Sequence, residues 1–245
     1  MINLEKKAGI PIFLTKNNKL TSKLIKIPKP EIRTFEKLKN VLLLKKTAVK
    51  NFYYMYRNIA PNPVFLNYSL RYDITIIPPN KIGNELVKTL GHYHKKIKNK
   101  KISYPEVYQV IHGEAFYLLQ KKEGEKIKDV ILAKAKEGDI IVVPPNYGHV
   151  TINPSNKTLV MANIVYASMK SDYKEIEKKH GACYYVIKKK NKIIFVKNQS
   201  YKDSPKIRFK KPTIKILKSP IYNDCTENPN KYLFLIKPEK FKFDI

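Results

Sequence analysis

Two histidines separated by one residue head the side chains of this sequence that could perform chemistry. His92 and His94 lie in the segment Gly-His-Tyr-His, and residues i and i+2 of a β-strand project from the same face. Such a pair alone is as often a solvated strand face as a binding site. A carboxylate, Glu106, and a third imidazole, His149, follow along the chain. If the four converge inside a barrel, they form an open site for a divalent metal that polarises bound oxygens.

The spacing of these four residues relative to nearby glycines and prolines supports such convergence. It follows H-x-H…E-x6-G over residues 92–113 and G-x5-P-x4-H-x3-N over residues 138–153. These are the two halves of the cupin pattern, in order. We therefore interpret the four residues as ligands of one divalent metal ion per subunit. Fe2+ is expected, and Mn2+, Ni2+ or Zn2+ suit the same imidazoles.

Two departures from the cupin pattern are visible. Eleven residues, Lys95–Pro105, separate His94 from Glu106 where three or four are usual, and five of them are Lys. Asn146 stands where the second half of the pattern usually has Gly, and Asn is the other residue that best tolerates a left-handed turn. Neither departure removes a ligand.

The elements that must position these side chains are short strands. From about residue 68 onward, β-branched runs alternate with turn residues every 8–12 positions, which is typical of a sandwich or barrel. His112-Gly113 and Lys190-Asn191 indicate hairpins. The predicted strands are Tyr68–Ile77, Leu86–Tyr93, Glu106–Ile111, Ala115–Lys121, Ile127–Ala133, Ile140–Val143, Val150–Ile152, Thr158–Tyr166, Tyr184–Lys189 and Lys192–Lys197.

The rest of the chain predicts additions to one barrel. Residues 1–60 are interpreted as an N-terminal arm, extended and interrupted by Pro, with one helix that begins after Thr34. Residues 61–200 are the predicted metal-binding barrel, and residues 201–245 a Pro-rich C-terminal extension that packs on the barrel or on a partner. The expected fold class is all-β, a cupin double-stranded β-helix (jelly-roll) with a helical and extended N-terminal arm.

Composition excludes several other classes of protein. The 245 residues are 43% hydrophobic and include 17 Tyr and 10 Phe, enough for a substantial core. No apolar run approaches the roughly 18–20 residues of a membrane span. Cys183 and Cys225 are too few for a disulfide framework or a four-Cys zinc site, and Cys183 is expected to be buried. We expect a soluble cytoplasmic protein.

The net charge of +29 raises the question of nucleic-acid binding. Only four of the 49 basic residues are Arg, however, and Lys is spread over the whole length. Nucleic-acid readers depend on the Arg fork, and no zinc-finger spacing or RNA-binding aromatic pair is present. Nucleic acid is therefore not expected as the main partner. The same charge favours attraction of small phosphorylated metabolites.

A family resemblance rests on four stretches of sequence. They are Thr-Leu-Gly-His-Tyr-His at 89–94, Glu-Val-Tyr at 106–108, Tyr-Leu-Leu-Gln at 117–120, and Val-Pro-Pro-Asn-Tyr-Gly-His-Val-Thr-Ile-Asn at 143–153. Together they resemble the cupin-type glucose-6-phosphate isomerases, the metal-dependent form found mainly in archaea. The resemblance covers roughly half the chain. It implies that the four residues interpreted above as ligands do hold the metal.

The resemblance also implies substrate contacts. The family's phosphate contacts fall on Thr75, Thr89, Gly91 and Tyr173, and Tyr108 corresponds to a tyrosine near the substrate. Two hydroxyls, an accessible backbone N–H and a phenol can surround a phosphate without excess charge.

Two positions differ from the family. An active-site tyrosine corresponds to Val165, with Tyr166 one place further on, and a histidine corresponds to Ser171. These differences affect the contacts to the sugar and leave the proposed ligands intact.

These residues predict a metal-dependent aldose–ketose isomerase that interconverts glucose 6-phosphate and fructose 6-phosphate. Glu106 would be the general base and Tyr108 a proton relay, while the metal polarises O1 and O2 of the open-chain sugar. A metal-assisted hydride shift and the acceptance of mannose 6-phosphate stay open. The alternatives are a cupin dioxygenase, which uses the same ligands with iron, and a non-catalytic cupin that binds sugar phosphates or nucleic acid. A homodimer is expected, paired through the arm and the tail.

Overall fold

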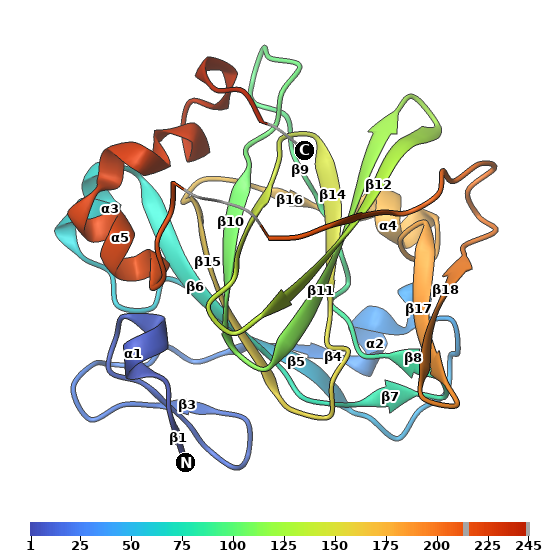
Figure 1. The fold of residues 1–245 in the computed structure, drawn as a ribbon, viewed down its shortest axis with the longest axis horizontal. Coiled ribbons are helices and arrows are strands. Elements are labelled where there is room, and N and C mark those ends of the chain that lie inside the picture. Colours follow the sequence, from blue (N-terminus) through green and yellow to red (C-terminus); the bar gives the residue numbers. More distant parts are fainter. Residues whose placement is uncertain (213–215, 244–245) are drawn as a thin grey trace.

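Two facing β-sheets form the centre of the computed structural model, which describes residues 1–212 and 216–243 (Figure 1). The larger sheet is antiparallel with the order β13-β10-β15-β6-β5-β4, and the smaller sheet has the order β14-β11-β12-β19. The strands of the larger sheet are β4 (Glu31–Thr34), β5 (Asn51–Tyr56), β6 (Leu70–Ile77), β10 (Glu106–His112), β13 (Ile140–Val143) and β15 (Leu159–Tyr166). Those of the smaller sheet are β11 (Glu114–Glu123), β12 (Lys126–Lys136), β14 (Tyr147–Ile152) and β19 (Arg208–Lys210).

Short elements surround these two sheets. Small sheets are formed by β1 (Ile2–Asn3), β2 (Phe13–Leu14) and β3 (Leu20–Thr21), by β9 (Tyr93–His94) and β16 (Ser171–Asp172), and by β7 (Lys81–Ile82), β8 (Glu85–Leu86), β17 (Tyr184–Lys189) and β18 (Lys192–Lys197). The α-helices are α1 (Glu5–Ala8), α2 (Phe35–Leu38), α3 (Pro63–Asn67), α4 (Lys174–Lys178) and α5 (Ile221–Glu227). The 3-10 helices are η1 (Lys39–Val41), η2 (Pro229–Leu235) and η3 (Pro238–Lys240).

The chain crosses repeatedly between the two central sheets. It leaves the larger sheet after β10, forms β11 and β12 in the smaller sheet, and returns for β13 before it crosses again to β14 and back to β15. This alternation is the jelly-roll connectivity, in which side chains from both sheets fill the space between them. The predicted all-β cupin barrel is confirmed.

The predicted hairpin at His112-Gly113 is wrong. β10 pairs with β13 and β15, whereas β11 pairs with β12 and β14, so Gly113 is a corner between the sheets. Its φ is +81°, and a Cβ there would lie 2.7 Å from the carbonyl oxygen of Thr158. The sharp turn against residue 158 directs the chain into the other sheet. The hairpin predicted at Lys190-Asn191 is present, between β17 and β18.

The helix predicted after Thr34 begins there but is short. One α-helical turn, α2, continues as η1 and stops at Val41, because Leu42 adopts an extended backbone. The next backbone N–H, of Leu43, donates to the buried carboxylate of Glu85 at 2.7 Å. The N–H of Leu43 is therefore bonded to the Glu85 side chain and is not available to continue the helix.

Two more expectations differ from the structure at the N-terminal side. The expected boundary near residue 60 lies between β5 and β6, which pair, so residues 31–56 contribute two strands to the barrel sheet. The strand predicted over Leu86–Tyr93 is divided into β8, isolated bridges and β9. Gly91, with φ of +84°, interrupts the extended chain just before His92.

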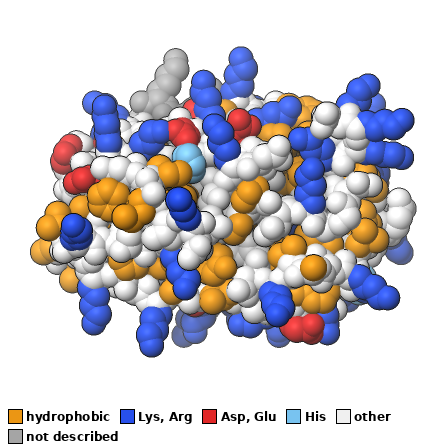
Figure 2. Space-filling view, turned by 90° about the horizontal axis from the view of Figure 1, so that it is seen from below, with side chains coloured by type: hydrophobic (Ala, Val, Ile, Leu, Met, Phe, Trp, Pro, Cys, Tyr) orange, Lys and Arg blue, Asp and Glu red, His pale blue; other side chains and the backbone are white. Residues whose placement is uncertain are grey.

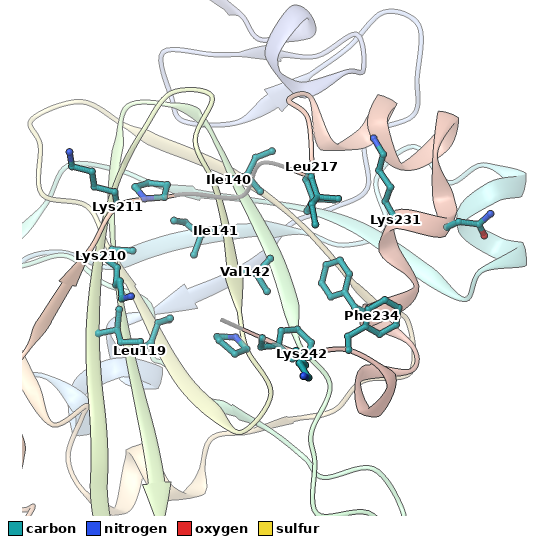
Figure 3. A pocket seen from close by; sticks show the side chains of 18 residues that line it. Leu119, Ile140, Ile141, Val142, Lys210, Lys211, Leu217, Lys231, Phe234 and Lys242 are labelled. Atoms are coloured by element: carbon teal, nitrogen blue, oxygen red, sulfur yellow. The ribbon is translucent and has the colours of Figure 1, made fainter. Parts of the chain in front are cut away.

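The C-terminal extension packs on the outer face of the larger sheet. Leu217, Ile221, Cys225 and Tyr232 belong to one buried cluster with strand residues such as Ile74. Gln109 of β10 links the barrel to the N-terminal arm and to the C-terminal extension. Its amide nitrogen donates to Lys7 O and Ser219 Oγ, and its amide oxygen accepts from Ile221 N, each at 2.8 Å. A groove of about 710 Å³ lies beside this extension (Figure 3). It is lined by apolar side chains of β11, β12, β13 and the extension and by several lysines, among them Lys210 and Lys231.

Lysine and arginine side chains are scattered over the molecular face in Figure 2 without forming a single patch. This distribution agrees with the spread of Lys along the sequence. Among the described helices, none is long and apolar enough to cross a membrane.

Both cysteines are expected to be inert in the folded protein. Cys183 and Cys225 are fully buried, and burial raises the pKa of each thiol to about 12. Because the thiolate is the reactive form, neither should react with a disulfide reagent at pH 8 until the protein is unfolded in guanidinium. A thiol titration with and without denaturant measures this, and rapid reaction of the native protein would contradict the packing described.

Candidate metal centre and its cavity

Three imidazoles and one carboxylate meet between the two sheets. His92 and His149 are joined by reciprocal backbone hydrogen bonds of 3.2 and 3.0 Å, and His94 follows on β9. Glu106 is the first residue of β10, and its Oε2 lies 3.2 Å from His94 Nε2 and 3.4 Å from His149 Nε2. The ring centroids of His92 and His149 are 4.4 Å apart. One potential ligand atom from each of the four residues lies within 4.8 Å of all the others.

Unpaired polar atoms show that this donor set suits a cation. His94 Nε2, Glu106 Oε2 and His149 Nδ1 are buried and make no hydrogen bond. The carbonyl oxygen of Tyr104 lies 2.7 Å from His94 Nδ1, which fixes the proton on that nitrogen and leaves Nε2 as a ligand atom. Buried polar atoms without partners are costly, and a divalent metal would satisfy His94 Nε2 and Glu106 Oε2, which lie 3.2 Å apart. The cluster could therefore hold a metal ion.

The electrostatics of the cluster keep the donors in the form that binds a metal. Burial, followed by the neighbouring His149 and His94, holds the pKa of His92 well below its ordinary value. Burial also lowers the pKa of His149. Burial alone would raise the pKa of Glu106, but its contacts with His149 and His94 outweigh that effect and hold it well below the usual range. Neutral imidazoles beside an ionised carboxylate are the required donors.

Tyr108 lies beside this cluster and stays protonated. It is two residues after Glu106 on β10, and its hydroxyl is 3.2 Å from His149 Nε2. Burial, and then the charge of Glu106, raises the pKa of Tyr108 well above its ordinary value. The phenol is therefore available as a proton donor near the carboxylate.

The four positions expected to contact phosphate line the cavity that contains His92, Glu106 and His149. The cavity has a volume of about 70 Å³. Thr75 lies on β6, while Thr89 Oγ1 accepts from Thr151 N at 3.0 Å. A Cβ on Gly91 would lie 2.4 Å from Val150 Cγ2, so only Gly fits there.

Tyr173 forms the rim of the cavity together with an arginine. Its ring centroid is 5.3 Å from that of His92. Its hydroxyl accepts from Arg33 Nη2 at 3.2 Å, and the same guanidinium lies over the ring at 5.4 Å. A cation thus stands directly beside the phenol.

Of the two positions that differ from the family, Ser171 lines the cavity and Val165 does not. Ser171 lines the cavity and is paired with His94 through β16 and β9. Val165 is fully buried opposite Glu106 and contributes no polar group. Tyr166, on the other side of the strand, contacts the ring of Tyr104 at 4.5 Å between centroids.

A second charged cluster was missed by the sequence analysis. Asp73 is fully buried, and its carboxylate accepts from Arg57 Nη1 at 2.8 Å, Arg71 Nε at 2.9 Å and Asn58 N at 2.8 Å. Both arginines line the cavity, and Arg33 is beside it. Three of the four arginines of the chain thus gather at this site. Because Arg is so scarce beside Lys in this sequence, the few Arg positions were the sequence feature that could have indicated the cluster.

Comparison with known proteins agrees with this geometry. Residues 32–206 match the family model described as "Glucose-6-phosphate isomerase (GPI)". The glucose-6-phosphate isomerase of Thermococcus litoralis is 34% identical over 139 residues, which is 57% of this chain and 65% of that protein. The one from Pyrococcus furiosus is 30% identical over 133 residues, or 54% and 65% of the two chains. The matches thus span somewhat less than two thirds of these relatives.

Solved structures are more remote. An oxalate decarboxylase from Lactobacillus farciminis aligns at 18% identity with a TM-score of 0.35, covering 49% of this chain and 30% of that one. A likeness this weak says nothing about the reaction.

Removing one imidazole should weaken metal binding strongly without unfolding the barrel. We expect His149→Ala to weaken binding of Fe2+ or Mn2+ at least about 100-fold, because one of four donors is lost. Equilibrium dialysis with metal analysis measures the affinity, and circular dichroism checks the β-structure. His112→Ala is the matched control, since His112 contacts Glu137 at the end of β10 instead of the cluster. Parental metal affinity in His149→Ala would refute the assignment.

Proposed function

Since this chain belongs to the cupin-type glucose-6-phosphate isomerase family, we propose that it interconverts glucose 6-phosphate and fructose 6-phosphate. The four proposed metal ligands, His92, His94, Glu106 and His149, are called the His/Glu cluster below. The observation that carries the proposal is one small cavity, lined by three members of this cluster (all but His94) and by Thr75, Thr89 and Tyr173. A dioxygenase has no need for a phosphate-binding wall beside its metal.

The proposed cofactor is one divalent metal ion held by the His/Glu cluster. Fe2+ is the proposed ion, with Mn2+, Ni2+ or Zn2+ as alternatives for the same donors. A metal bound there supplies Lewis-acid stabilisation of developing negative charge.

Glu106 is the proposed general base. Its depressed pKa means that the carboxylate is ionised and can accept a proton at neutral pH. In the open-chain aldose, Glu106 would remove the proton from C2 and return it to C1, while the hydroxyl proton passes from O2 to O1 with Tyr108 as relay. Atoms balance, because the two sugars are isomers.

The alternative to this route is a hydride shift from C2 to C1. The two routes differ in exchange with solvent, since only a proton held on Glu106 can be lost to water. We expect deuterium to enter the carbon-bound positions during turnover in D2O. NMR of the product measures the exchange, and complete absence of incorporation would favour the hydride shift.

The phosphate is proposed to bind Thr75, Thr89, the Gly91 backbone N–H and Tyr173. These residues all line the same cavity, and Arg33 adds a positive charge beside Tyr173. Anchoring the far end of the sugar holds the reacting carbons in position.

A coupled isomerase assay tests the reaction itself. The purified protein should convert fructose 6-phosphate, lose activity after chelation and regain it with added metal. Mannose 6-phosphate should be offered in parallel to define the range of substrates. Oxygen uptake by an iron-loaded sample without isomerisation would instead favour the dioxygenase.

Loss of one hydroxyl at the phosphate wall should raise KM. We expect Thr89→Val to raise KM for fructose 6-phosphate about ten- to hundredfold, with a smaller fall in kcat, because the anchor binds substrate more than it assists chemistry. Thr89 also accepts a backbone hydrogen bond, so Thr75→Val serves as the second variant. Thr158→Val is the control, since that hydroxyl bonds Asn18. Unchanged KM in both wall variants would exclude this phosphate position.

We also propose a cytoplasmic homodimer. Exposed apolar side chains, among them Phe209 at 59% and Ile216 at 70% exposure, are available for subunit contact. Light scattering at micromolar concentration gives the mass, and a monomer would contradict the dimer.

A further inference from the structure

Six buried side-chain atoms of the described residues have no hydrogen-bond partner. Three of them belong to the proposed metal ligands, and a metal would bind two of these three, His94 Nε2 and Glu106 Oε2. One of the others is the amide nitrogen of Asn163, a residue of β15 that is 2% exposed and lines the cavity. An unpaired buried amide in a cavity wall needs an explanation, because such groups destabilise the fold.

The cross-strand neighbours of Asn163 make no hydrogen bond to its amide nitrogen. Across the sheet it stands between Tyr108 on β10 and Asp73 on β6. Both oxygens of Asp73 already accept hydrogen bonds from Arg57 and Arg71. The Tyr108 hydroxyl is next to His149. Because Asn163 lines the cavity, a ligand bound there is the partner that its unpaired amide could take.

The position of Asn163 in the sheet indicates which part of a ligand it meets. Two residues after Asn163 on β15, Val165 is paired with Glu106 of β10. Two residues before it, Met161 is paired with Thr75 of β6. Each step of two residues is about 7 Å along the strand. Asn163 thus stands between the proton-transferring carboxylate and the proposed phosphate wall.

We propose that Asn163 is a specificity-determining residue that binds the hydroxyl at C3 or C4 of the phosphosugar. This rests on the proposed function, because it takes C1 and C2 to Glu106 and the phosphate to Thr75. An amide is both donor and acceptor, so it matches a hydroxyl in one stereochemical position and is left unpaired by the epimer. No other amide lines the described part of this cavity.

The melting temperature of Asn163 variants distinguishes a role in binding substrate from a role in stabilising the fold. Replacing an unpaired donor by an apolar group of similar size removes a destabilising feature, so Asn163→Leu should raise Tm by about 3–8 °C in the absence of substrate. Gln109→Met is the matched control on the adjacent strand. Its amide is fully bonded, so that variant should lose stability.

Substrate analogues then identify the contact. Asn163→Leu should lower kcat/KM for fructose 6-phosphate about 10- to 100-fold. On whichever of 3-deoxy- and 4-deoxy-fructose 6-phosphate lacks the bound hydroxyl, the same substitution should cost less than about threefold, because the parent has already lost the interaction. Asn163→Ala repeats the comparison in case leucine does not fit.

Binding measurements keep the inference independent of catalysis. Calorimetry of the metal-loaded protein with fructose 6-phosphate and the deoxy sugars should give the same selective loss of affinity. If the parent binds these sugars but does not isomerise them, the proposed reaction fails while Asn163 is still tested. An equal loss on all three ligands, or a lowered Tm in both Asn163 variants, would overturn the inference.

Discussion

A carboxylate buried between two β-sheets is the feature on which the rest of the site depends. Glu106 is 3% exposed and its pKa is held well below the usual range, and burial lowers the pKa of the nearby His92 and His149 imidazoles. A buried charge with incomplete hydrogen bonding is expensive, so the surrounding strands must hold compensating groups at fixed distances. The imidazoles come from β9, β14 and the bridge between them, and the carboxylate comes from the opposite sheet. The site therefore depends on correct assembly of both sheets, and its unpaired atoms are tolerated because the apolar barrel around them is extensive.

A second buried carboxylate shows how the same wall carries positive charge. Asp73 holds Arg57 and Arg71 against the cavity, which Lys could not do equally well, because the rigid guanidinium fork donates several oriented hydrogen bonds. Arg57, Arg71 and the nearby Arg33 outnumber the two carboxylates, Glu106 and Asp73, around the cavity. A bound divalent cation would add further positive charge there, which would favour a phosphate dianion. The lysines scattered over the surface act at longer range and are screened by salt.

Sequence patterns could predict the proposed ligands because each stands at a fixed distance from a turn glycine or proline, and local geometry sets those distances. They predicted strand positions well but not strand partners. Gly113 was interpreted as a hairpin, since a turn residue between two strands carries no information about which sheet comes next. Asp73, Arg57 and Asn163 were missed for a related reason. Asp73 meets Arg57 only when β5 and β6 pair, and it meets Asn163 only when β6 pairs with β15, which is far away in the chain.

The size of the cavity limits how a substrate can enter. The space described for the cavity, about 70 Å³, is small, so the side chains at its rim affect how a ligand would enter. Burial indicates which of these side chains are free to move. Tyr108 and Asn163 are buried side chains within central strands, so they have little room to move. Arg33 and Tyr173 are partly exposed, lie on the edge strand β4 and just before α4, and contact each other. Their separation would widen the cavity beside the proposed phosphate contacts. A phosphate that replaces the Tyr173 hydroxyl as the partner of Arg33 would compensate for the lost contact with a stronger, charge-assisted one.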